Sequence, residues 1–312
     1  MVALSQVFTL FLLLIVGYVV KKLGGVTERI HREISSLVLN VCLPASIITS
    51  MNFKFSPEVL AKSGILLLLS FIIYGVNIGI SYGIIGLMKL KGSRRDIFQY
   101  VLVFSNVGYM GYPIAQALMG SQGVFYTAVY NLTFTILVWT FGVHVMGRTP
   151  NMEKGITGDV GWRVRIKRIL NLNLMAVFIG FALFVFSVRL PGPIDNTLKM
   201  IGGCCTPLSM MFIGFILADL ELKDVVNDFQ IFAVSAVRLL VLPGIVWIGL
   251  HFTGIHGDIA LLPVVSTAMP AAANTAIFAA LYDNDYQLGS KIIFISTLLS
   301  IATIPLVILF MR

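Results

Sequence analysis

Two stretches of the chain combine helix-breaking residues with side-chain amides, and they are the first candidates for a ligand site. One reads Asn106-Val-Gly108-Tyr-Met-Gly111-Tyr-Pro113, and the other reads Met269-Pro270-Ala-Ala-Ala-Asn274. Proline lacks a backbone donor and disfavours helix in the residue before it, while glycine removes side-chain packing. Each stretch therefore predicts a broken helix, whose freed backbone amides and nearby Asn106 or Asn274 would suit a carboxylate. The alternative is that the prolines only kink two packed helices.

Arg238 lies inside a long apolar stretch and is the clearest charge in such a position. A central Arg costs a membrane helix about 2.5–3.5 kcal/mol on insertion scales, so it should face the protein interior beside a partner. Three roles are open for it. Arg238 could satisfy carbonyl groups released by the broken helices, extend toward the membrane interface, or contact the substrate.

Asn131 and Thr135 stand one helical turn apart in another apolar stretch and could face the same site. Hydrogen bonding between packed helices is the other explanation for them. All 14 acidic residues, Asp96 included, fall in predicted loops or at the ends of apolar segments. Because sodium/proton antiporters depend on embedded carboxylates, their absence argues against that function and leaves the coupling ion open.

The elements that must position these residues follow from composition. Of the 312 residues, 58% are hydrophobic and 12% are charged, with a mean hydropathy of +0.94. A soluble domain carries roughly twice that charge, and three Cys in apolar segments give no disulfide framework. A soluble enzyme, a nucleic-acid-binding protein and a secreted disulfide scaffold are therefore excluded.

Ten apolar segments are each long enough to cross about 30 Å of hydrocarbon as a helix. The first has no basic residue ahead of it and no small-residue cleavage site, so we expect no removed signal peptide. The predicted spans are Leu4–Val20, Ser35–Met51, Gly64–Leu87, Ile97–Leu118, Val124–Met146, Leu172–Val188, Met200–Leu217, Phe229–Leu250, Ile259–Leu281 and Ile292–Phe310.

The distribution of basic residues predicts the orientation. Of the 22 Lys and Arg residues, 16 follow odd-numbered spans and five lie on the opposite side. By the positive-inside rule the basic loops are cytoplasmic and both termini lie outside a cytoplasmic membrane. The longest loop, residues 147–171, carries Arg163, Arg165, Lys167 and Arg168. It is either a basic stop that fixes topology or an interfacial segment attracted to anionic lipid.

The two halves of the chain, residues 1–146 and 172–312, repeat a pattern. Cys42-Leu-Pro44-Ala-Ser46 in the second span matches Cys205-Thr-Pro207-Leu-Ser209 in the seventh, 163 residues later, and Pro113 in the fourth matches Pro270 in the ninth. Since each half has five spans, the second begins from the opposite face of the membrane. Inverted repeats with broken helices in matching positions are typical of secondary transporters, which bind substrate near the midplane.

At these residues the chain resembles the auxin efflux carrier family, over essentially its whole length. The motifs are Asn106-x-x-x-Met110-Gly111-x-Pro113, Arg238 with Pro243, and Ala268-Met269-Pro270 followed by Phe278, Ala279 and Tyr282. The resemblance implies ten helices in a 5+5 inverted repeat, with helices 4 and 9 broken where they cross. It also implies a scaffold of helices 1, 2, 6 and 7, which forms dimers, and a moving transport domain of helices 3, 4, 5, 8, 9 and 10. By the same analogy Asn106, Pro113 and Pro270 bind substrate, and Ser46 is a further candidate.

The sequence thus favours a secondary carrier for a small organic anion, most simply a carboxylate, that works by elevator-type alternating access. The candidate substrate-binding residues are Asn106, Gly108, Gly111, Pro113, Pro270, Asn274, Ser46, Asn131 and Thr135. The alternative is a sodium-coupled organic-anion symporter of the bile-acid type. No nucleotide-binding, zinc or nucleophile motif occurs, so we expect no enzyme activity, catalytic residue, metal or cofactor. The expected partners are the anion, the lipid bilayer and a second copy of the chain, with no nucleic acid.

Overall fold

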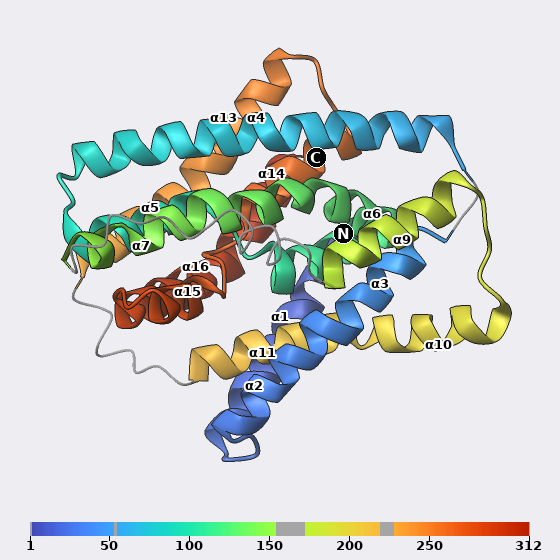
Figure 1. The fold of residues 1–312 in the computed structure, drawn as a ribbon, viewed down its shortest axis with the longest axis horizontal. Coiled ribbons are helices and arrows are strands. Elements are labelled where there is room, and N and C mark those ends of the chain that lie inside the picture. The colour runs from blue at the N-terminus through green and yellow to red at the C-terminus, as the bar shows by residue number, and fades with distance from the viewer. Residues whose placement is uncertain (1, 53–54, 154–171, 219–227, 312) are drawn as a thin grey trace. The chain divides into compact units, whose positions relative to one another are not determined.

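The computed structural model describes residues 2–52, 55–153, 172–218 and 228–311 (Figure 1). Within these ranges every regular element is a helix, apart from one isolated β-bridge. Among the described residues, five helical segments are long and apolar enough to cross a membrane: Pro57–Leu87, Val107–Met152, Gly192–Ala218, Phe229–Phe252 and Tyr286–Phe310. Shorter apolar helices cover Val38–Ser50, Leu172–Val185 and Asp258–Ala268. The chain is thus a polytopic all-α membrane protein, and the count of ten spans and the inverted repeat stay predictions.

The chain divides into two compact units, each of which takes residues from both halves of the sequence. Unit 1 holds residues 1–67, 107–132 and 170–219, and unit 2 holds residues 68–106, 133–169 and 220–312. Helices α4 (Pro57–Leu87) and α6 (Tyr112–Leu137) contribute to both units. The repeat boundaries expected from the sequence stay predictions, and the basic stretch from Arg163 to Arg168 lies outside the described residues.

Unit 1 is built around two closely packed helix pairs. Its elements are α1 (Val2–Lys22), α2 (Glu28–Leu37), η1 (Val38–Cys42), α3 (Leu43–Ser50), η2 (Val107–Gly111), α9 (Leu172–Val185), α10 (Gly192–Gly203) and α11 (Cys205–Ala218). Helix α1 packs on α11 (Figure 1), where a Cβ on Gly214 would lie 2.1 Å from the Leu14 carbonyl oxygen. Helix α3 packs on α9, where a Cβ on Gly180 would lie 2.7 Å from the Met51 sulfur. At Gly214 only glycine permits so close an approach, because the neighbouring atom is backbone, whereas at Gly180 the neighbour is a flexible methionine side chain.

Unit 2 has its apolar core between α4, α13 and α14. Its other elements are α5 (Gly92–Val103), η3 (Val138–Gly142), α7 (Val143–Glu153), α12 (Phe229–Ala236), η5 (Val237–Val241), α13 (Leu242–Phe252), α14 (Asp258–Ala268), α15 (Thr275–Leu281) and α16 (Tyr286–Phe310). Leu69 and Ile73 of α4 pack with Val246 of α13 and Val264 of α14 in one buried cluster. Helix α7 runs to Glu153, seven residues beyond the predicted end of that span.

Three of the helices contain a widened, π-helical turn directly before a proline. The turns η1, η2 and η5 end at Cys42, Gly111 and Val241, and each is followed two residues later by Pro44, Pro113 or Pro243. A proline ring has no N–H and clashes with the carbonyl one turn earlier in a regular helix. A π-helical turn spaces its hydrogen bonds more widely, so the chain can remain helical through these prolines instead of breaking there.

Candidate functional site

In unit 2, α5 and α14 both end in extended backbone, and these extended residues meet. Phe104 after α5 has φ −104° and ψ 119°, and Met269 after α14 has φ −63° and ψ 147°. Pro270 accounts for the second break, because proline disfavours helix in the residue before it. We call residues 104–106 and 269–274 the crossing segments.

The crossing segments pair in an antiparallel manner. Ser105 and Ala271 form an antiparallel bridge. The Asn106 amide donates to the Pro270 carbonyl at 2.9 Å, and the Ala272 amide donates to the Phe104 carbonyl at 3.3 Å. Broken backbone is tolerated at membrane depth only where protein or a watery cavity satisfies its polar groups. Here each crossing segment donates one backbone hydrogen bond to a carbonyl of the other.

Arg238 of η5 supports both helix ends next to the crossing. Its side chain is fully buried, with Nη1 3.1 Å from the Leu102 carbonyl oxygen and Nε 3.3 Å from the Met269 carbonyl oxygen. Each carbonyl lies at or near the end of a helix, where the helix no longer supplies a backbone donor. The contact is the one expected if Arg238 satisfies carbonyls released by the breaks. A direct contact with substrate stays a prediction.

Side chains outside the predicted site also hold the crossing. Ser296 of α16 accepts a hydrogen bond from the Ala271 amide at 3.1 Å. The Tyr100 hydroxyl donates to Asn274 Oδ1 at 3.3 Å. The Tyr100 ring lies 4.6 Å from that of Phe104 and 5.8 Å from that of Phe278, between centroids. Asn274 is therefore held beside an aromatic cluster, which sequence spacing alone did not predict.

The helices that follow the breaks begin at residues other than those predicted. The sequence places their starts near Pro113 and Pro270. In the structure η2 begins at Val107, six residues before Pro113, and α15 begins at Thr275, five residues after Pro270. The first difference arises because the widened turn of η2 accommodates Pro113, and the second because residues 270–272 pair with 104–106.

Apart from Thr135, which belongs to unit 2, the remaining candidates lie in unit 1. Gly108 and Gly111 belong to η2, and Pro113 is the second residue of α6. Ser46 lines a polar cavity of about 250 Å³ within unit 1, together with Tyr112, Gln116 and Lys199 among others. The Tyr112 hydroxyl lies beside the Asn131 side chain.

The predicted site residues are therefore divided between the two units. Asn106, Thr135, Arg238, Pro270 and Asn274 belong to unit 2, and Ser46, Gly108, Gly111, Pro113 and Asn131 belong to unit 1. Within unit 2 the structure joins Asn106 to Pro270 and Arg238 to Met269, the residue before Pro270. Within unit 1 it brings Asn131 beside Tyr112, the neighbour of Pro113. The role of each residue in binding stays a prediction.

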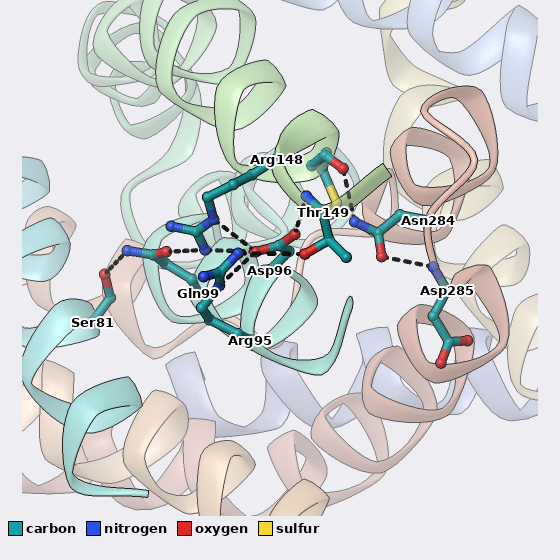
Figure 2. Close-up of polar contacts among 9 residues, drawn as sticks. Ser81, Arg95, Asp96, Gln99, Arg148, Thr149, Asn284 and Asp285 are labelled. Atoms are coloured by element: carbon teal, nitrogen blue, oxygen red, sulfur yellow. Dashed lines mark hydrogen bonds and ion pairs between the residues drawn. The ribbon is translucent and has the colours of Figure 1, made fainter. Parts of the chain in front are cut away.

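A buried carboxylate in unit 2 is the main polar feature that the sequence did not reveal. The sequence places Asp96 at the end of a predicted span, and in the structure it lies in the first half of α5 and is fully buried. Figure 2 shows it between two guanidinium groups. Arg148 donates to Asp96 Oδ1 from Nε at 2.8 Å and from Nη2 at 2.6 Å, and Arg95 Nε donates to the same oxygen at 3.0 Å. The Thr149 amide donates to Oδ2 at 2.9 Å.

This network joins three helices of unit 2. Arg148 also donates to Gln99 Oε1 at 2.8 Å, and Gln99 Nε2 donates to Ser81 of α4 at 3.4 Å. Asn284, beyond α15, donates to the Met146 carbonyl of α7 at 2.7 Å (Figure 2). Among the described residues no group of three or more His, Cys, Asp or Glu side chains is placed to hold a metal ion.

These observations define a multi-pass helical membrane protein with two interrupted helices paired in its interior. A family model described as membrane transport protein matches residues 2–308. The chain belongs to this auxin efflux carrier-type membrane transport family, as the sequence motifs predicted. It is 27% identical over 309 residues to an uncharacterized transporter of Methanothermobacter thermautotrophicus, covering 97% of this chain and 96% of the relative. It is 26% identical over 310 residues to an uncharacterized transporter of Methanocaldococcus jannaschii, covering 98% of each.

Proposed function

We propose that the protein is a secondary carrier that moves a small organic anion, a carboxylate, across the cytoplasmic membrane. The observation that carries this proposal is the pairing of residues 104–106 with 269–272 next to the buried Arg238 guanidinium, in a chain of a membrane transport family. The crossing segments contain no Asp or Glu. In a low-dielectric interior the positive charge of Arg238 acts over several ångströms and favours an anion over a cation.

The mechanism that fits this proposal is elevator-type alternating access. In it, unit 2 carries the crossing segments and the substrate, while unit 1 supplies the scaffold. The rigid features of each unit support this division of roles: unit 1 has glycine-mediated helix contacts, and unit 2 has the Asp96 network. Dimer formation through unit 1 and cytoplasmic basic loops complete the proposal, by resemblance to the family and by the positive-inside rule.

The two close helix contacts of unit 1 support the proposed repeat. Gly17 lies against Met211 and Gly214 on α11, and Gly180 lies against Met51 at the end of α3. Gly180 follows Gly17 by 163 residues, and Gly214 follows Met51 by the same number. This is also the offset between Pro44 and Pro207. One helix pair would therefore be the counterpart of the other in the second half of the chain.

The test is uptake by the purified protein in liposomes, with a panel of labelled mono- and dicarboxylates. We expect accumulation of at least one anion, and strong reduction in Asn106→Ala. Asn40→Ala is a matched control, because Asn40 is an exposed amide of unit 1. Uptake of a cation with no anion flux would overturn the proposal. Anion uptake that requires a sodium gradient would select the sodium-coupled alternative.

A further inference from the structure

An apolar groove in unit 2 lies among α13, α14 and α16. It has a volume of about 220 Å³ and is lined by Leu240, Pro243, Gly244, Trp247, Val264, Leu306, Val307, Phe310 and Met311. None of these residues carries a charge. Val264 is part of the apolar core of the unit, and Val307 and Met311 pack against that core, so this side of the groove rests on buried residues.

A second pocket of about 230 Å³, with both polar and apolar residues in its lining, adjoins the groove. It is formed where α13 ends, α14 begins and α16 ends, and it contains His251, His256 and Asp258. The His251 and His256 rings lie 6.0 Å apart, and the His251 ring stacks on that of Trp247 at 5.7 Å. Trp247 and Met311 line both the groove and the pocket, so the two are direct neighbours.

This combination fits an amphipathic molecule with an apolar tail and a small polar head. The groove runs along the apolar segment Phe229–Phe252, which is long enough to cross a membrane, and the pocket lies at the end of that segment. Tryptophan is enriched where hydrocarbon meets the headgroup region. A phospholipid of the surrounding bilayer has this shape and this polarity.

The polar side chains of the pocket determine which phospholipid headgroup fits it. The imidazole N–H groups of His251 and His256 can donate to phosphate oxygens, and the Asp258 carboxylate can accept from an ammonium group. The lining that the structure describes holds one carboxylate, Asp258, and no Lys or Arg, so Asp258 disfavours a headgroup with net negative charge. A trimethylated amine has no N–H to donate. We propose that this site binds a phospholipid whose headgroup carries a primary ammonium beside its phosphate, namely phosphatidylethanolamine.

Native mass spectrometry of the purified protein tests the proposal. The protein in detergent is mixed with equal amounts of phosphatidylethanolamine, phosphatidylglycerol and phosphatidylcholine. We expect retention of phosphatidylethanolamine at one site per chain. Gly244→Leu should weaken this binding roughly tenfold, because its side chain would displace about two methylenes of the tail. Gly249→Leu is the matched control on the same helix. A Cβ at either glycine meets no atom within 4 Å, and Gly249 does not line the groove.

The headgroup is tested separately by Asp258→Asn. We expect this variant to lose the preference for phosphatidylethanolamine over phosphatidylglycerol while it still binds lipid. Equal retention of the three lipids, unchanged by Gly244→Leu, would show unspecific surface lipid and overturn the proposal. A change in oligomeric mass with Gly244→Leu, without a change in bound lipid, would assign the groove to a second copy of the chain and overturn it as well. Because binding is measured without flux, either result leaves the proposed transport function to its own test.

Discussion

Replacing Asp96 by Asn removes the charge at the centre of the polar network of unit 2. Asp96 accepts hydrogen bonds from Arg95, Arg148 and the Thr149 amide, and its side chain is fully buried. The isosteric amide has one acceptor oxygen, and its NH2 group must face a guanidinium or a backbone N–H. Two cations would then lie close together without their common anion.

The size of the effect follows from burial. Breaking a buried ion pair by removing one partner costs about 3–5 kcal/mol. The Arg95 and Arg148 side chains keep 27% and 18% of their exposure, so water compensates part of the loss. We therefore expect Asp96→Asn to lower the free energy of unfolding by about 3 kcal/mol. Titration from a mild detergent into dodecyl sulfate, followed by circular dichroism, measures this difference.

The matched control is the pair between Arg94 and Asp228, which joins their side chains at 2.7 Å with 40% and 26% exposure. Exposed pairs contribute about 0–1 kcal/mol, so Asp228→Asn should change stability far less than Asp96→Asn. The double variant Asp96→Asn/Arg148→Gln should lose less than the sum of the two single losses, by about 0.5–3 kcal/mol. Equal losses for Asp96→Asn and Asp228→Asn, or strict additivity in the double variant, would refute the reasoning.

Three further predictions concern the crossing, the helix contacts and pH. Arg238→Ala leaves the Leu102 and Met269 carbonyls without this donor, so it should abolish transport and lower the free energy of unfolding by roughly 3 kcal/mol. Arg238→Lys should retain part of the transport and part of the stability. Normal flux and normal melting in both variants would contradict this prediction. Gly214→Leu should reduce folded yield in size-exclusion chromatography, because its Cβ would collide with backbone of α1, while Gly203→Leu, with open space at Cβ, should not. Partial burial opposes ionisation of Asp228, but Arg94 and two backbone amides outweigh this effect and lower the pKa of Asp228. The ionised Asp228 therefore contributes to stability above about pH 4, and this contribution is lost as the pH falls through the lower pKa of the folded state. Stability measured between pH 3 and 7 should lose this step in Asp228→Asn.

Sequence patterns predicted the break at Pro270, because proline acts through local backbone geometry. The first break lies at residues 104–106, ahead of the glycines and Pro113 that had indicated it. Pro270 fixes the extended conformation of Met269 whatever surrounds it. Burial cost likewise indicated that Arg238 would need an interior partner, and the structure supplies carbonyls from α5 and from the end of α14. Local chemistry was therefore a good guide at these positions.

Other features depend on residues far apart in the chain, and the sequence could not reveal them. Asp96 stands next to Arg94 and Arg95 in a typical charged turn, and nothing local indicates that Arg148, 52 residues later, covers it. The start of η2 at Val107 was missed for a different reason. Whether Pro113 breaks a helix or follows a widened turn depends on packing of that turn, since η2 contacts α11 and the Tyr109 ring lies 4.5 Å from that of Phe212.

The glycine contact between α1 and α11 also limits how unit 1 can deform. Backbone meets backbone at Gly17 and Gly214, so no side chain lies between the helices there that could change rotamer and permit a second spacing. Spin labels on the outer faces of these two helices should therefore keep one separation through every step of a turnover. The distance between these two labels would then be a constant reference for distance changes measured elsewhere in the molecule.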